Sequence, residues 1–150
     1  MMMEDKHILE IIKATPLVAI DLIIRNPSEK VLLGKRINRP AKGYWFVPGG
    51  RIIKNETICH ALKRISKAEV GLDLSTEIHN LFGVYEHIYE DNFFNVKGIN
   101  THYVVLAFAI QLQQDIEVKP DEQHSALEWW GIDKLLEDPT VHNNTKVYFR

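Results

Sequence analysis

Hydrophobic residues recur along the chain in two spacings, which separate the segments expected to form strands from those expected to form helices. Continuous runs of β-branched, aliphatic and aromatic residues are typical of buried strands and of their antiparallel partners. Such runs predict strands at 17–25, 31–36, 45–47, 81–89, 101–112 and 127–132. A turn at 26–30, which contains Pro27 and Ser28, is expected to join the first two strands as a hairpin.

Three further segments have the features of helices. Apolar residues at helical spacing predict an amphipathic helix over 1–14, which Pro16 ends. The segment 56–70 contains neither Gly nor Pro and many good helix formers, and a short helix is expected at 133–137. Together with the strands, this order predicts an α+β fold, in which a mixed sheet carries one long helix on a face and smaller helices at its ends.

Length and charge limit the possible functions. A chain of 150 residues has the size of one domain, and no linker or repeat divides it, so residues 1–150 are expected to form one domain. The formal net charge of -2 and the pI of about 6.4 give no bulk attraction to nucleic acid or to an anionic membrane. The basic residues that matter must therefore be local, and the candidates are Arg36, Arg39, Arg51 and Arg64.

Cysteine content and hydropathy point to a compartment. The chain has one cysteine, Cys59, which excludes an internal disulfide. No apolar run is long enough for a membrane span or for the apolar part of a signal segment. We therefore expect a cytoplasmic protein with neither nucleic acid nor membrane as a partner.

Between residues 49 and 72, a glycine turn, an acidic residue, an arginine and a second glycine stand at fixed offsets. The residues at these offsets are Gly50, Glu56, Arg64, Glu69, Gly71 and Leu72. They resemble the Nudix box, whose consensus is Gly-x5-Glu-x7-Arg-Glu-U-x-Glu-Glu-x-Gly-U, where U is an apolar residue. The match is incomplete, because Ile65 and Ala68 replace two glutamates of the consensus and Ser66 replaces an apolar residue.

The departure from the consensus changes the expected metal chemistry. Positions 65, 68 and 69 are spaced i, i+3 and i+4, so carboxylates there would share one helix face and bind hard divalent cations together. Only Glu69 supplies a carboxylate on that face. We therefore expect fewer metal ions than in an ordinary Nudix site, with other parts of the chain compensating.

Two other segments extend the resemblance over nearly the whole chain. GKRINRPAKGYWFVPGGR precedes the box and PDEQH follows it at a distance. In this combination the chain resembles one Nudix branch, the GDP-mannose mannosyl hydrolases. The resemblance implies the Nudix fold and a Mg²⁺-dependent hydrolysis of GDP-mannose, or of related GDP-sugars. Attack at the anomeric carbon would release intact GDP and a free sugar of inverted configuration.

The resemblance also implies a set of metal ligands. Mg²⁺ prefers octahedral oxygen coordination and keeps several waters, so one carboxylate can serve if neutral oxygens and the substrate add the rest. Glu69 is the first expected ligand. The family implies that the Gly49 carbonyl and the Gln123 side chain complete the protein's share, with one ion in each subunit.

The reaction then needs a base and cations. Among seven histidines, most are expected to be structural, and His124 is the candidate base because it adjoins Gln123 in a predicted loop. Inversion places the base on the sugar face opposite the leaving group, with room for one water. Arg36 and Arg51 are expected to bind the diphosphate and to stabilise the charge on departing GDP.

Other residues are candidates for substrate binding, each with a plainer alternative. Asp21 interrupts an apolar strand, so it either faces water at an edge or points into a polar cleft, which we favour. His87 is a candidate donor to sugar or phosphate, and the arginine of the box, Arg64, joins the binding set. Tyr103 either contacts the diphosphate or packs on its strand. Phe93 and Phe94 either pack in their loop or form a wall of a ligand site.

Three functions are compatible with these residues. The first is the sugar hydrolase. The second is an ordinary Nudix pyrophosphohydrolase that splits a nucleotide sugar at phosphorus, which the missing glutamates disfavour. The third is a non-catalytic nucleotide-sugar sensor. The resemblance and the apolar N-terminal segment also suggest a homodimer, although that segment could equally pack on its own domain.

Overall fold

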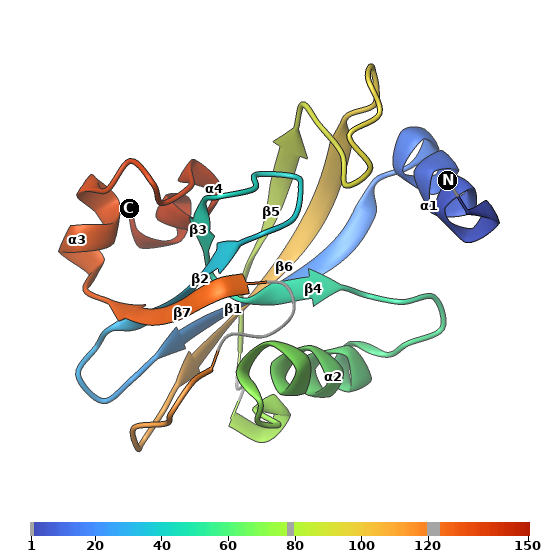
Figure 1. Cartoon of the computed structure of the whole chain (residues 1–150). Helices are drawn as coiled ribbons and strands as arrows, with labels where there is room; N and C mark the ends of the chain where they lie inside the picture. Colours follow the sequence, from blue (N-terminus) through green and yellow to red (C-terminus); the bar gives the residue numbers. More distant parts are fainter. Residues whose placement is uncertain (1, 78–79, 120–123) are drawn as a thin grey trace.

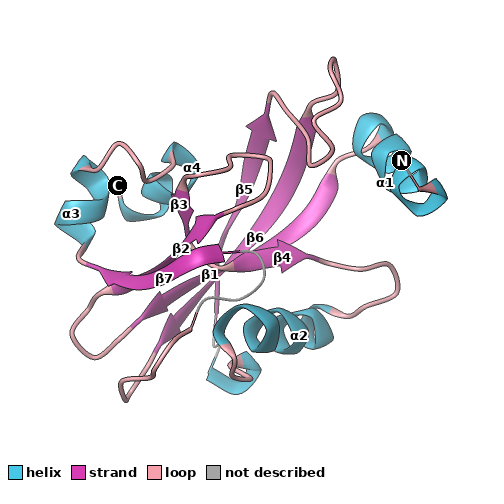
Figure 2. Ribbon diagram, in the orientation of Figure 1, coloured by secondary structure: helices cyan, strands magenta, loops and turns pink. Residues whose placement is uncertain are grey.

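The fold is an α+β arrangement around one seven-stranded mixed sheet (Figures 1 and 2). It is taken from a computed structural model, in which residues 2–77, 80–119 and 124–150 are described. The helices and strands run in the order α1 (Met3–Ala14), β1 (Leu17–Arg25), β2 (Val31–Arg36), β3 (Trp45–Phe46), β4 (Gly49–Arg51), α2 (Ile58–Val70), β5 (Asn80–Tyr89), β6 (Thr101–Gln111), β7 (His124–Trp130), α3 (Ile132–Glu137) and α4 (Asn143–Lys146). Short 3-10 turns, Ser75–Glu77 and Val147–Phe149, follow α2 and α4.

Strand β1 organises the sheet, because it pairs with three other strands. It runs parallel to β6 along its whole length, from Leu17 beside Tyr103 to Arg25 beside Gln111. On its other edge β2 pairs only at its end, and β4 pairs antiparallel at residues 19–21. Beyond that point β2 turns to pair with β3 and β7. The sheet therefore divides beside the middle of β1, and this division provides room for a site.

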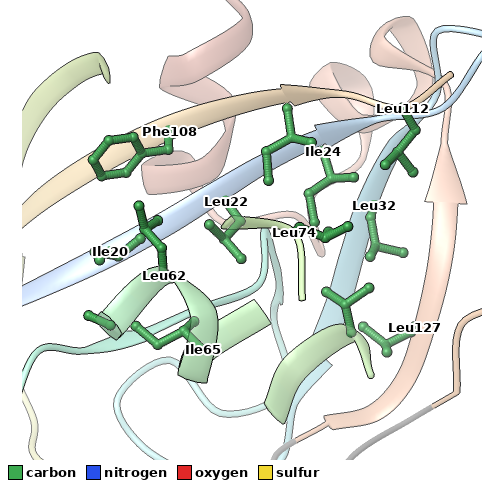
Figure 3. Packing of buried hydrophobic residues seen from close by; sticks show 13 residues of the cluster. Ile20, Leu22, Ile24, Leu32, Leu62, Ile65, Leu74, Phe108, Leu112 and Leu127 are labelled. Carbon is green, nitrogen blue, oxygen red and sulfur yellow. The ribbon is translucent and has the colours of Figure 1, made fainter. Parts of the chain in front are cut away.

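Two hydrophobic clusters cover the two faces of the sheet. Even-numbered residues of β1, such as Ile20 and Leu22, pack with Leu62 and Ile65 of α2 on one face (Figure 3). The odd-numbered Ile23 belongs to the second cluster, which includes residues of the C-terminal segment. This alternation follows from the two-residue period of a strand. The layers agree with the predicted sandwich of a mixed sheet between helices.

Helix α2 has clear signals at both ends. The Thr57 side chain accepts a hydrogen bond from the His60 amide at 3.2 Å, which satisfies one of the unpaired amides of the first turn. Gly71 ends the helix with a φ of 86°, a left-handed conformation that glycine adopts without steric cost. The predicted helix 56–70 is thus confirmed, starting two residues later.

Several local predictions differ from the structure. Gly49 and Gly50 were expected in a turn but lie in β4. The reason is that β2 leaves part of the β1 edge open, and a short strand pairs there. The last strand begins at His124, not at 127, because β2 offers pairing partners as far as Arg36. No element was predicted after residue 137, where α4 and a 3-10 turn lie.

Helix α1 stands beside the end of β1 and β6 (Figure 1). Ile12 is buried against the body, whereas Met2, Met3 and Ile11 are exposed. Packing of this face on a second subunit stays a prediction. Within the described residues, no helix is both long and apolar enough to cross a membrane.

Candidate active site

A cavity of about 580 Å³ lies where the sheet divides. Residues from α1, β1, the end of β2 and the segment after it, β3, β4, α2, β5, the loop after β5, β6 and the start of β7 line it. Most of the predicted site residues border this cavity. They are Asp21, Arg36, Gly49, Arg51, Arg64, Glu69, His87, Tyr103 and His124.

Asp21 lies inside the sheet and not at a water-facing edge, so the favoured prediction of a polar cleft agrees with its position. It pairs with Gly49 of β4, and an added Cβ at Gly49 would stand 2.5 Å from an Asp21 oxygen. The Tyr148 hydroxyl donates a hydrogen bond to its Oδ2 at 2.6 Å. Burial raises the pKa of Asp21 to about 6, partly offset by Tyr148 and by the charge of Arg36.

His87, on β5, is joined to the same hydroxyl. Its Nε2 lies 3.4 Å from the Tyr148 oxygen, and its side chain is 4% exposed. Burial, reinforced by nearby His142, lowers the pKa of His87 to about 4. The ring is therefore neutral near pH 7, and Tyr148 bridges an acidic and a basic side chain from different strands.

Glu69 and His124 form a buried pair at the cavity wall. His124 Nδ1 lies 3.3 Å from Glu69 Oε2, and these side chains are 3% and 4% exposed. Gly34 of β2 makes this possible, because a Cβ there would stand 2.6 Å from the imidazole Cδ2. His124 was expected in a loop, but the structure places it in β7 with its ring packed over Gly34.

Arg64, in the middle of α2, links the helix to Glu56 and β4. Arg64 donates to both Glu56 carboxylate oxygens, at 2.7 and 3.0 Å, and to the Arg51 carbonyl at 2.7 Å. Glu56 also accepts from the Ile53 amide at 3.1 Å. The Arg64 hydrogen bond holds the pKa of Glu56 down at about 2. These contacts orient α2 against β4, so a binding role for Arg64 stays a prediction.

Two other arginines face the cavity. The guanidinium of Arg36 lies 5.7 Å from the centre of the Phe46 ring. Its Nε is buried and has no hydrogen-bond partner among the described residues. Arg51, on β4, pairs with Ala19 of β1 and is exposed. Both are therefore available to an anion in the cavity.

The donors near Glu69 suit a hard divalent cation. Glu69 supplies a buried carboxylate, and an added Cβ at Gly49 would stand 2.4 Å from the Ile20 carbonyl, so only glycine fits at that place. Within the described residues, no group of three or more His, Cys, Asp or Glu side chains gathers as a metal site. One carboxylate with neutral oxygens fits Mg²⁺ that keeps waters and substrate oxygens. Gln123, the other predicted ligand, lies outside the described residues.

Sequence reasoning missed Tyr148. It lies in the last 3-10 turn, and its hydroxyl contacts Asp21, 127 residues earlier in the chain. The one signal was the unpaired carboxylate in an apolar strand, which needs a donor but does not name it.

The family follows from comparison with known proteins. The model described as NUDIX domain matches residues 15–150. The chain belongs to the Nudix family. Nudix hydrolases use divalent metals such as Mg²⁺, and the predicted Nudix fold is confirmed. The MutT protein from Methanosarcina mazei Go1 superposes with a TM-score of 0.73 at 18% identity, covering 91% of this chain and 92% of that one, which shows the fold alone.

Two relatives come from curated proteins. This Nudix chain is 44% identical over 130 residues to the low-salt glycan biosynthesis protein Agl8 of Haloferax volcanii, covering 86% of this chain and 76% of that protein. It is 43% identical over 70 residues to the ADP-ribose pyrophosphatase of Methanocaldococcus jannaschii, covering 47% of this chain and 40% of that protein. The first similarity covers most of both chains, whereas the second covers about half of this chain and less than half of that protein.

Proposed function

We propose that this Nudix hydrolase cleaves GDP-mannose, or a related GDP-sugar, at the anomeric carbon, giving GDP and the free sugar with inversion. The observation that carries the proposal is the pairing of His124 with Glu69 at the wall of a cavity that lacks the other box carboxylates. The name of the Haloferax relative, a glycan biosynthesis protein, fits a sugar-containing substrate.

The residues at positions 65 and 68 of α2 disfavour attack at phosphorus. Ile65 is 1% exposed and packs in the core, where a Cβ on Gly50 would stand 3.1 Å from it. Ala68 borders the cavity and offers no oxygen. A box that activates water at phosphorus with several metal ions needs carboxylates at these places. The remaining carboxylate, Glu69, suits one ion.

The leaving group is then GDP, whose charge must be neutralised. Arg36 and Arg51 supply two cations at the cavity, and the planar guanidinium binds two phosphate oxygens at once. Mg²⁺ held by Glu69, the Gly49 carbonyl and Gln123 would add positive charge on the diphosphate. A diphosphate stabilised in this way departs without protonation by a general acid.

The base is assigned to His124. A neutral imidazole takes a proton from the water that attacks the sugar face opposite the diphosphate. The adjacent Glu69 carboxylate orients the ring and favours the imidazolium that forms. Asp21 and His87 are then placed for the sugar hydroxyls, with Tyr148 joining them.

Product analysis in ¹⁸O-water tests the proposal. With GDP-mannose and Mg²⁺, the label is expected in the sugar and absent from GDP. Label in a phosphate would replace the proposal with pyrophosphohydrolase activity. Tight binding without turnover would replace it with a sensor. Replacing Arg36 or Arg51 by Gln is expected to lower kcat more than it raises KM, because both act on charge that develops as GDP departs.

A further inference from the structure

The loop between β5 and β6 is held rigid by one side chain. Asn92 is 0% exposed. Its Nδ2 donates to the carbonyls of Val96 and Ile99 at 2.8 and 2.7 Å. Its Oδ1 accepts from the amides of Phe94 and Val96 at 3.1 and 3.2 Å. Four hydrogen bonds from one buried amide fix the path of a loop that could otherwise adopt many conformations.

This rigid loop presents two aromatic rings to the cavity. Phe93 and Phe94 meet edge to face, with centroids 5.2 Å apart and planes at 84°, and both line the cavity. Phe93 is nevertheless 54% exposed. Arg39 donates to Asp91 at 3.1 Å, which ties the loop to the segment after β2. A large ring held in place but left open to solvent is a surface on which a flat ligand can stack.

One face of α1 lines the same cavity. Asp5, Ile8 and Ile12 lie at helical spacing, and all three border it. Figure 1 shows α1 and the β5–β6 loop at the same end of the sheet. The strand register agrees with this placement of α1 and the loop. Leu17, which follows α1, pairs with Tyr103. Thr101, which follows the loop, pairs with Tyr89.

The cavity groups follow the order of the parts of a nucleotide sugar. Along β1, Asp21 lies beside Gly49 and Ala19 lies beside the cation Arg51. Leu17 lies beside Tyr103, at the end of β1 that follows α1. Four residues of strand separate the first from the last, roughly 13 Å. A polyol, a diphosphate and a flat base joined in a line match this sequence of polar, cationic and aromatic surfaces.

Asp5 can select the base. Its carboxylate has no hydrogen-bond or ion-pair partner among the described residues. Guanine presents two adjacent N–H donors on its Watson–Crick edge, which a carboxylate accepts together, whereas adenine presents a donor beside an acceptor. A site built to receive two donors rejects the analogue that lacks them.

We propose that the end of the cavity between α1 and the β5–β6 loop is a guanine subsite, in which the base stacks on Phe93 and Phe94 and donates to Asp5. The proposal rests on the proposed function only in assuming a nucleoside diphosphate substrate. It does not depend on which bond is broken.

Calorimetric binding of GDP and ADP with Mg²⁺ to the whole chain tests it, with Mg²⁺-pyrophosphate as a ligand without a base. Phe93→Ala is expected to weaken GDP binding by about 10- to 100-fold, the usual range for loss of one base-stacking ring. Pyrophosphate affinity is expected to stay the same. Because Phe93 is exposed, the variant keeps its fold, which thermal unfolding checks. Ile88→Ala, on an exposed residue of β5 that does not border the cavity, is the matched control and is expected to bind GDP normally.

Asp5→Asn tests the choice of base. It is expected to reduce the preference for GDP over ADP by about tenfold or more, because an amide no longer accepts both guanine donors and can pair with the donor and acceptor of adenine. The proposal is overturned if Phe93→Ala binds GDP within twofold of the parent, or loses pyrophosphate affinity equally. It is also overturned if the parent prefers ADP, or if Asp5→Asn keeps the full preference. Label in phosphate from ¹⁸O-water, with these binding results intact, would contradict the proposed reaction and leave the subsite standing.

Discussion

Replacing Gly34 by alanine moves the proposed base without touching it chemically. A Cβ at this position would stand 2.6 Å from Cδ2, 2.9 Å from Cγ and 3.0 Å from Nε2 of His124. Ordinary carbon contacts are about 3.5–4.0 Å, so the ring must retreat by roughly 1 Å. The shift also moves His124 Nδ1 away from its position 3.3 Å from Glu69 Oε2, so the carboxylate no longer orients the ring.

The expected cost falls mainly on turnover. A misplacement of about 1 Å at a catalytic group can lower the rate by about 10²-fold, whereas added volume in a packed strand pair costs about 1–3 kcal/mol of stability. We therefore expect Gly34→Ala to fold, to bind GDP with Mg²⁺ close to normally, and to hydrolyse GDP-mannose about 100-fold more slowly. His124→Gln is expected to fall by a similar or larger factor, about 10²–10⁴.

Initial rates of GDP release, GDP calorimetry and urea unfolding measure these effects. Gly131→Ala is the matched control, because a Cβ there meets no atom within 4 Å and the backbone φ is -66°. The double variant Gly34→Ala with His124→Gln should be no slower than His124→Gln alone, because the two substitutions remove the same function. A folded Gly34→Ala enzyme whose kcat is within threefold of the parent would refute the assignment of His124.

Three other predictions follow from the same side chains. Glu69→Gln should raise the Mg²⁺ concentration needed for half-maximal rate and strongly reduce kcat; an unchanged metal titration would place the ligands elsewhere. Tyr148→Phe should cost about 1–2 kcal/mol of stability, because it removes the hydrogen bond to Asp21. It should also lower kcat for GDP-mannose while GDP affinity is kept. Equal losses of kcat and of GDP affinity would make the hydroxyl merely structural. Because His87 has a folded pKa of about 4, below the unfolded value of about 6.5, its contribution is full above pH 6.5 and is lost as pH falls towards 4. Urea unfolding should show a loss of up to about 3 kcal/mol over that range that His87→Gln lacks, and parallel curves would contradict it.

The sequence predicted best what depends on local pattern. The strand 17–25 and the helix after Thr57 were expected from continuous and helical apolar spacing, and the structure places them at nearly those bounds. The box offsets predicted that Glu69 shares a helix face with positions 65 and 68, and all three residues border the cavity. These features need no knowledge of distant contacts.

What could not be predicted depends on contacts between distant segments. The short strand Gly49–Arg51 forms only because β2 leaves part of β1 open, which no property of two glycines reveals. His124 is buried rather than in a loop because β2 extends to meet it. The Tyr148 hydroxyl reaches Asp21 across 127 residues, and one sequence carries no signal of that separation.

The contacts of Arg64 separate the part of the Nudix box that holds α2 in place from the positions where this chain departs from the consensus. Glu56, Arg64 and the Arg51 carbonyl form a brace that holds the helix to the strand, and none of their mutual hydrogen bonds involves positions 65 or 68. The chemistry on the neighbouring face can therefore change without loosening the brace. In this chain, Ile65 and Ala68 therefore stand on a helix whose placement against β4 does not depend on them for these hydrogen bonds.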